Sequence, residues 1–246
     1  MKTKLKYVLL FASILCIVIF SCRKEPQPTI YYGYDYFPTK VGHYVIYQCD
    51  SITVNLFSKN VPPFDTFKYQ IKEVIDSIYQ NNSGQPTMRI VRYKRTDTSM
   101  AWSNILTEEK VWTGNLLPTQ ALRMEDNYNY IKLIFPMTLN EQWNGNAYNT
   151  IGAWNYQYTA LHVPATINGT RFDSTLTVSQ QKDSSLQGYQ YYFEQYATGV
   201  GLVHKVVIDW NTDGSNFLSF TSPPLIESAT GGTIFYSEIY LSSGNQ

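Results

Sequence analysis

The segment Phe-Lys-Tyr-Gln-Ile-Lys at residues 67–72 alternates aromatic or aliphatic side chains with polar ones at every second position. This period of two puts the two kinds of side chain on opposite faces of a β-strand, one buried and one in water. Residues 89–95, Arg-Ile-Val-Arg-Tyr-Lys-Arg, are also rich in β-forming residues. Further runs of this kind lie at residues 128–135, 189–196, 202–210 and 234–241. The sequence therefore predicts a series of strands.

Clusters of Asn, Gly, Ser and Asp separate these runs, at residues 81–84, 144–146, 168–170 and 213–215. Asn and Gly tolerate the positive φ that tight hairpin turns require. No window has the sustained 3.6-residue apolar period of a helix. About a dozen short strands joined by hairpins predict an antiparallel all-β fold with few or no helices, in one domain at residues 31–246.

A short motif occurs twice in the predicted domain. Residues 37–42, Phe-Pro-Thr-Lys-Val-Gly, and 135–140, Phe-Pro-Met-Thr-Leu-Asn, share an aromatic residue, a proline and an apolar residue at the fifth position. Either the domain holds two related halves, or the same strand-entry sequence is used twice. The second explanation is simple, because proline at the start of a strand removes a donor where none is needed.

Residues 1–21 have the layout of a secretory signal peptide. Three lysines within the first six residues precede an apolar stretch at 8–20, which is shorter than the roughly 20 residues that span a bilayer. Ser21-Cys22 resembles the lipobox of bacterial lipoproteins, although Phe20 stands where that motif usually has a small residue. The resemblance implies cleavage before Cys22 and acylation of Cys22. Residues 22–30 are then the lipid anchor and a polar, proline-containing tether.

Charge argues against a nucleic-acid partner. The chain has 19 basic and 19 acidic residues, and loss of the three signal-peptide lysines leaves a net charge of −3. Binding to phosphates requires a basic patch. The one basic cluster lies in a predicted strand, and we interpret it as a solvated strand face; it consists of Arg89, Arg92, Lys94 and Arg95. Cys49, on an aromatic strand with no neighbour to lower its pKa, is expected to be buried and inert.

Residues 209–214 fit the opening of a calcium loop, D-x-N-x-D-G, with Asp209, Asn211 and Asp213 as candidate ligands. The twelfth position of such a loop supplies a bidentate glutamate, but here it is Phe220. The flanking residues predict strands instead of helices. A hairpin with Asp-Gly at its tip is therefore the favoured interpretation, and we expect no other metal site.

Signatures of catalysis are absent from the sequence. It contains no G-x-S-x-G, H-E-x-x-H or P-loop motif, and the Gly-Val-Gly at 199–201 lacks the third glycine of a dinucleotide loop. A sugar hydrolase needs two carboxylates facing each other across a cleft, which the sequence cannot show for its scattered acids, such as Glu108, Glu109 and Glu141. We expect no catalytic residue and no cofactor.

Five tryptophans allow two interpretations. They fill the core, which the burial of large aromatics favours, or some of them stack on sugars or line a concavity for an acyl chain. They are Trp102, Trp112, Trp143, Trp154 and Trp210.

Three stretches, at residues 37–44, 135–146 and 196–203, resemble the FPxxxGxxW/Y, FPxxxxxxWNGN and YAxGVGLV signatures of uncharacterised secreted lipoproteins of the Bacteroidota. The last signature is also similar to one in TapB-type half-barrel proteins. The resemblance implies a curved antiparallel sheet or half-barrel in the cell envelope, with binding of an apolar or extended ligand by analogy. It carries no catalytic residues.

From these observations we expect a non-catalytic outer-membrane lipoprotein that acts in binding or in envelope structure. One alternative is a carbohydrate-binding accessory lipoprotein of a polysaccharide-uptake system, and another is an envelope hydrolase. The expected partners are the membrane, through the acyl chains, and a lipid or glycan ligand. A single acidic residue in Arg23-Lys24-Glu25 does not decide between the periplasmic and the surface face of the membrane, and the sequence does not predict an oligomeric state.

Overall fold

A computed structural model describes residues 31–57, 64–102, 108–185, 187–212, 229 and 231–246. The chain divides into two units, Met1–Tyr31 and Tyr32–Gln246. All the described residues except Tyr31 belong to the second unit, and the following account concerns that unit. Cys22 and the predicted tether lie outside the described residues.

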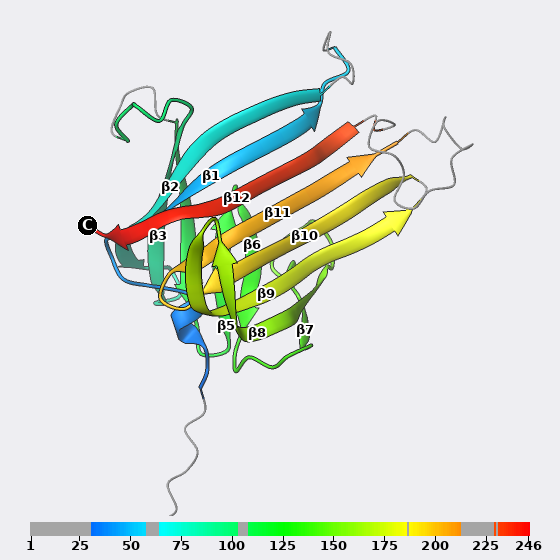
Figure 1. Ribbon diagram of the computed structural model, residues 1–246. Helices are drawn as coiled ribbons and strands as arrows, with labels where there is room; N and C mark the ends of the chain where they lie inside the picture. The colour runs from blue at the N-terminus through cyan, green and yellow to red at the C-terminus, as the bar shows by residue number, and fades with distance from the viewer. Residues whose placement is uncertain (1–30, 58–63, 103–107, 186, 213–228, 230) are drawn as a thin grey trace, which may run out of the picture. The chain divides into compact units, whose positions relative to one another are not determined.

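The second unit is a 12-stranded antiparallel sheet in the order β6-β5-β4-β3-β2-β1-β12-β11-β10-β9-β8-β7 (Figure 1). Besides strands, the described residues contain one 3-10 turn, η1 (Tyr34–Tyr36). The strands are β1 (His43–Val54), β2 (Phe64–Gln80), β3 (Pro86–Arg95), β4 (Glu108–Leu116), β5 (Gln120–Glu125), β6 (Tyr128–Ile134), β7 (Gln142–Asn144), β8 (Asn155–Ile167), β9 (Thr170–Ser185), β10 (Gly188–Ala197), β11 (Gly201–Asn211) and β12 (Gly231–Asn245). The predicted all-β, antiparallel fold class is confirmed.

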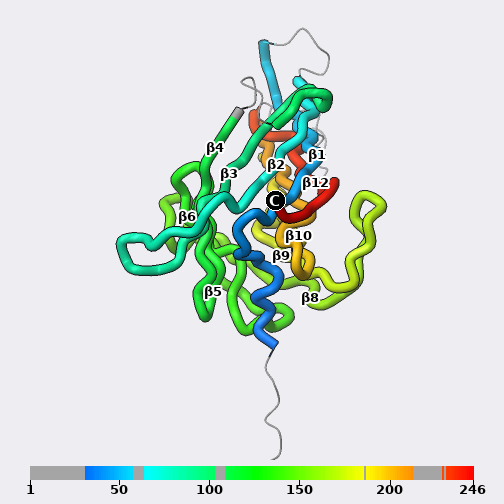
Figure 2. The backbone as a smooth tube through the Cα atoms, turned by 90° about the vertical axis from the view of Figure 1, so that its left-hand side faces the viewer, coloured from blue at the N-terminus to red at the C-terminus, as the bar shows by residue number. Residues whose placement is uncertain are grey.

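The sheet curls until its two edges nearly meet, so it forms an almost closed barrel (Figures 1 and 2). A few hydrogen bonds join β6 to β7 and to the segment that follows it. The backbone N–H of Ile131 donates to the carbonyl of Gly145 at 2.9 Å, and Trp143 Nε1 donates to the carbonyl of Ile131 at 2.8 Å. An isolated antiparallel bridge pairs Asn129 with Tyr148. These contacts pair a few of the backbone groups that an open sheet would leave unpaired at its edges.

One end of the barrel, where β1 begins and β12 ends, is filled by apolar side chains. The turn η1 lies there, and Tyr36 is fully buried with its hydroxyl 2.7 Å from Ser174 Oγ and 3.0 Å from His162 Nδ1. Phe37 and Phe135, which start the two Phe-Pro motifs, both join the buried core. We call this end the plugged end. Because it is packed, it closes the barrel interior on one side.

The two Phe-Pro motifs occupy equivalent places in the fold. Residues 37–42 lead into β1, which starts a run of six consecutive strands, and residues 135–140 lead into β7, which starts the second run of six. The sixth residue of each motif has positive φ: 85° at Gly42 and 67° at Asn140.

The hydrogen bonds of the two motifs also match. In each, the residue after the motif donates its N–H to the carbonyl of the fourth motif residue at 3.1 Å: His43 to Lys40, and Glu141 to Thr138. The sixth residue donates to the second strand of its own run: Gly42 to Ile75 at 2.8 Å, and Asn140 to Tyr158 at 2.9 Å. These matches favour the interpretation that the domain holds two related halves.

None of the helical structure within the described residues is long and apolar enough to cross a membrane.

Candidate functional site: a charged cleft inside the barrel

A cleft of about 500 Å³ opens on the inner face of the sheet. It is bordered on one side by β2–β6 and on the other by β11 and β12. Its lining combines aromatic and charged side chains: Tyr69, Ile71, Arg92, Tyr93, Lys94, Lys110, Trp112, Glu125, Asp126, Tyr128, Tyr130, Lys205, Tyr236 and Glu238. The volume lies within the roughly 300–1,000 Å³ of small-molecule pockets. We call this site the charged cleft.

Two arginines and two glutamates form the first part of an ionic network inside the barrel, and some members of this network also line the charged cleft. Arg92 Nε lies 2.7 Å from Glu73 Oε1, and Arg92 Nη2 lies 2.5 Å from Glu238 Oε1. Arg123 Nη2 lies 2.6 Å from the same Glu73 oxygen. All four side chains are buried, so the attraction between opposite charges is screened little by water. Glu73 thus bridges two guanidinium groups.

The second part of the network joins two lysines to two more glutamates. Lys132 Nζ lies 2.9 Å from Glu125 Oε1 and 2.8 Å from Glu194 Oε1. Lys205 Nζ lies 3.4 Å from Glu125 Oε2 and 3.5 Å from Glu194 Oε1. Arg123 Nε, 3.4 Å from Glu125 Oε1, connects this part to the first. The network therefore balances four cations with four carboxylates.

Aromatic side chains complete the surroundings of the network. The guanidinium carbons of Arg92 and Arg123 lie 3.9 and 5.0 Å from the centre of the Trp112 ring. The hydroxyl of Tyr196 donates to Glu194 Oε2 at 2.5 Å, and that of Tyr236 donates to Glu238. Buried charges need this kind of additional hydrogen bonding, because desolvation costs several kcal/mol per ion.

The network holds three of its carboxylates, those of Glu125, Glu194 and Glu238, in the ionised form. Burial by itself would raise the pKa of Glu125, but Lys132, Lys205 and Arg123 outweigh it and hold that pKa below its usual range. The same balance, burial against nearby cations, lowers the pKa values of Glu194 and Glu238. Burial would lower the pKa of Lys132, but Glu125 and Glu194 raise it. Every group in the network for which a shift is resolved is thus stabilised in its charged state.

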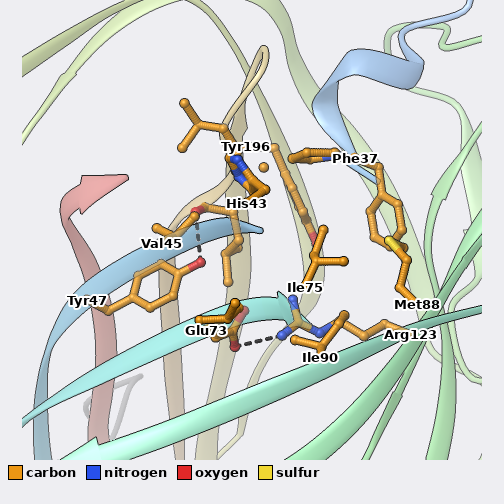
Figure 3. Close-up of a pocket in the computed structure, with 15 residues that line it drawn as sticks. Phe37, His43, Val45, Tyr47, Glu73, Ile75, Met88, Ile90, Arg123 and Tyr196 are labelled. Atoms are coloured by element: carbon orange, nitrogen blue, oxygen red, sulfur yellow. Dashed lines mark hydrogen bonds and ion pairs between the residues drawn. The ribbon is translucent and has the colours of Figure 1, made fainter. Parts of the chain in front are cut away.

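Toward the plugged end, the interior becomes apolar and tight. Figure 3 shows the ion pair of Arg123 with Glu73 at the boundary of a pocket lined by side chains such as Ile75 and Met88. The hydroxyl of Tyr47 donates to the carbonyl of Leu202 at 3.0 Å in the same region. The volume of this pocket is about 50 Å³. It is far smaller than the pockets that hold small-molecule ligands.

Tyrosines stand at both sides of the charged cleft. Tyr128 and Tyr130 come from β6, with ring centres 6.5 Å apart, and Tyr69 and Tyr236 come from β2 and β12. Burial raises the pKa of Tyr69 to about 12, with Cys49 and Glu238 adding to the shift. The Tyr69 hydroxyl is therefore neutral at physiological pH and can both donate and accept hydrogen bonds.

The structure places the sequence-predicted site residues as follows. Asp209 lies on β11, and its carboxylate accepts hydrogen bonds from Tyr192 Oη at 2.5 Å and Gln190 Nε2 at 3.2 Å. Asn211 ends the same strand, whereas Asp213 lies outside the described residues. Among the described residues, no group of three or more His, Cys, Asp or Glu side chains could hold a metal ion. The calcium loop stays a prediction.

The acids considered for catalysis lie on two parts of the fold, Glu108 and Glu109 on β4 and Glu141 before β7. Glu109, on β4, is half exposed and lies 3.9 Å from Arg89 on the neighbouring strand. Glu141 immediately precedes β7, and Glu108 begins β4. The carboxylates that the fold does bring together are the four of the network.

One expectation was wrong and two are confirmed. The basic cluster is not a single solvated face, because Arg92 is buried in the network while Arg89 pairs with the exposed Asp76 on the outside. Cys49 is buried and unpaired with another cysteine, as expected, and its burial raises the pKa of the thiol. Trp112 and Trp210 are buried core residues, and Trp143 and Trp154 pack against the core, as favoured. Trp112 also lines the charged cleft, as the other interpretation allowed.

No protein-family model matches the chain, and no curated protein matches it. A comparison with solved structures finds the crystal structure of a protein from Bacteroides fragilis, described as exported and as having a YmcC-like fold. The two chains are 10% identical, with a TM-score of 0.44 over 85% of this chain and 98% of that chain. A likeness of this extent carries no argument about function.

Proposed function

We propose that this protein is an outer-membrane lipoprotein, anchored through Cys22, that binds an extended polar ligand in the charged cleft without catalysing a reaction. The signal-peptide layout and the Ser21-Cys22 pair support the anchor. The charged cleft, with a volume of about 500 Å³, is the observation that supports binding.

The chemistry of the barrel interior supports a polar ligand over an apolar one. A carrier of acyl chains needs a long apolar cavity, but the apolar pocket at the plugged end has a volume of only about 50 Å³. The larger cleft is lined by arginine, lysine, glutamate and tyrosine side chains, whose charged and polar groups an acyl chain would remove from water without offering them a hydrogen bond. Of the expected ligands, a polar one suits this lining better.

The electrostatics of the network support binding without catalysis. A general acid at neutral pH needs a carboxyl whose pKa is raised toward the working pH. Here the cations lower the pKa values of Glu125, Glu194 and Glu238. Such carboxylates are hydrogen-bond acceptors and fixed charges. A hydrolase that works with two carboxyl groups would need its general acid from outside the network.

The anchor is tested by replacing the cysteine that is expected to carry the acyl chains. We expect Cys22→Ser to block lipidation and to move the protein from the membrane fraction to the soluble fraction. Cys49→Ala is the matched control, because Cys49 is buried in the barrel, and this variant should stay in the membrane fraction. A Cys22→Ser protein that still pellets with membranes would contradict the anchor.

The binding site is tested by analysing what the full-length protein carries when it is extracted from membranes. After denaturation, mass spectrometry should detect a hydrophilic ligand, and much less of it from a Tyr130→Ala variant. Stoichiometric free fatty acid, released in place of a polar ligand, would contradict the proposal.

A further inference from the structure

A second groove adjoins the charged cleft on the inner face of the sheet. Its volume is about 460 Å³, and its lining is rich in hydroxyl groups: Ser51, Thr53, Thr66, Phe67, Lys68, Tyr69, Lys94 and Thr96. Tyr69 and Lys94 line both the groove and the charged cleft. The two spaces therefore have a common border, and we call the second one the outer groove.

Strand pairing puts the outer groove in line with the cleft. On β1 and β2, Cys49 pairs with Tyr69 and Ser51 pairs with Phe67. Because paired residues share a face and side chains alternate along a strand, Phe67 lies on the same face as Tyr69, one step farther from the plugged end. The cleft and the outer groove thus form one trough along the strands.

The chemistry of the trough suits a carbohydrate. The Phe67 side chain is 51% exposed, which is unusual for a phenylalanine on the inner face of a barrel. Exposed aromatic rings offer flat apolar surface, and the neighbouring hydroxyls of Ser51 and Thr53 both donate and accept hydrogen bonds. Sugars present the same combination of apolar ring faces and hydroxyl edges.

A peptide fits this trough less well. Extended peptides are commonly bound by adding a strand to an exposed sheet edge. Each strand that lines the outer groove already has a partner on both sides: β1 has β2 and β12, β2 has β1 and β3, and β3 has β2 and β4. Recognition must therefore come from side chains alone.

We propose that the charged cleft and the outer groove together bind a single oligosaccharide of several sugar units, with Phe67 as the stacking platform for its outer units. This inference rests on the proposed function, since it assigns a chemical class to the ligand of the same cleft. The combined volume of the two spaces indicates a chain, because each alone is the size of a small-molecule site.

The test measures affinity against chain length. Cello-, xylo-, chito- and malto-oligosaccharides of two and six units are titrated calorimetrically into the full-length protein and three alanine variants. We expect at least one hexasaccharide to bind more tightly than its disaccharide. Phe67→Ala should weaken hexasaccharide binding about tenfold and leave disaccharide binding unchanged, whereas Tyr130→Ala should weaken both. Tyr79→Ala is the control: it removes another exposed aromatic ring from β2, near the plugged end, and should change neither affinity.

Four outcomes overturn the inference. If the hexasaccharide and the disaccharide bind equally tightly, the outer groove is not part of the binding site. The same conclusion follows if Phe67→Ala binds the hexasaccharide with full affinity. In both cases the charged cleft remains the binding site. If no oligosaccharide binds but mass spectrometry of the extracted protein detects another polar ligand that depends on Tyr130, the ligand class is wrong and the proposed function stands. If no oligosaccharide binds and no such ligand is detected, both the oligosaccharide inference and the proposed function are wrong.

Discussion

Lys132 is almost fully buried, and its ammonium group lies within 3 Å of two carboxylates, those of Glu125 and Glu194. Removing one partner from a buried ion cluster leaves uncompensated charge in a medium of low dielectric constant. We therefore expect Lys132→Met to lower the free energy of unfolding by about 3–5 kcal/mol, measured by urea denaturation.

Lys68→Met is the matched control for this prediction. The Lys68 side chain is 75% exposed and lies 3.8 Å from Asp50. An exposed pair contributes about 0–1 kcal/mol, so this variant should stay near the parent stability. Combining Lys132→Met with Glu194→Gln should recover part of the loss, because one negative charge leaves with the lysine. Equal losses for Lys132→Met and Lys68→Met would mean that the network adds little stability.

Arg89 and Arg92 show what the periodicity of a strand does not predict about burial. The run at 89–95 predicts a strand correctly, yet Arg89 and Arg92 look alike in that run while one is outside and the other is buried. A period of two assigns polar residues to a wet face by default. Arg92 reverses that assignment because Glu73, directly opposite it on β2, and Glu238, on the distant strand β12, both face it inside the barrel. The pairing of β2 with β3 supplies Glu73, whereas the curvature of the sheet is needed to bring Glu238 to Arg92.

At the scale of elements, the turn before β1 requires glycine for two separable reasons. Gly42 has a φ of 85°, and a Cβ there would lie 2.6 Å from the carbonyl oxygen of Gln246. Gly84 has a φ of 72° but open space around it. We expect Gly84→Ala to cost about 1–2 kcal/mol through backbone strain alone, and Gly42→Ala to cost more because of the added clash. Urea denaturation of both variants measures the difference.

The equivalent turn before β7 provides the complementary test. Asn140 adopts a φ of 67°, which Asn tolerates and Gly adopts freely. Asn140→Gly should therefore change stability by a few tenths of a kcal/mol at most, whereas Asn140→Ala should lose about 1 kcal/mol. A large loss for Asn140→Gly would show that the side chain, and not the backbone conformation, matters there.

The positions of the strands could be predicted from the sequence, because the two-residue alternation of a strand is visible within a short stretch of chain. The turn clusters at 81–84 and 168–170 do connect antiparallel neighbours, and the two Phe-Pro motifs do begin the two runs of six strands. The closure of the sheet was not predictable from the pattern. It depends on contacts such as that between Ile131 and Gly145, which periodicity does not encode.

At the scale of the whole sheet, the ionic network joins the two runs of strands across the barrel interior. Arg92 on β3 pairs with Glu238 on β12, Lys132 on β6 pairs with Glu194 on β10, and Glu125 on β5 pairs with Lys205 on β11; these are the contacts that cross. The edges at β6 and β7 share few backbone hydrogen bonds. Charge pairing therefore supports the curvature that keeps the charged cleft in shape.

This arrangement predicts how stability depends on pH. Because the folded pKa values of Glu125, Glu194 and Glu238 are lowered, their contribution is complete above the unfolded value of about 4.3 and is lost as the pH falls toward the folded values. The raised pKa values of Lys132 and Lys205 act in the opposite direction: their contribution is present below about pH 10.4 and is lost as the pH rises through the folded values. Urea midpoints should therefore form a plateau between about pH 5 and pH 10 and fall on both sides.

The variant Glu194→Gln tests this prediction on the acid side. The fall of the urea midpoint below about pH 5, which we call the acid limb, should be shallower in this variant, since one carboxylate no longer has to be protonated. An acid limb of unchanged steepness in that variant would place the titrating groups outside the network.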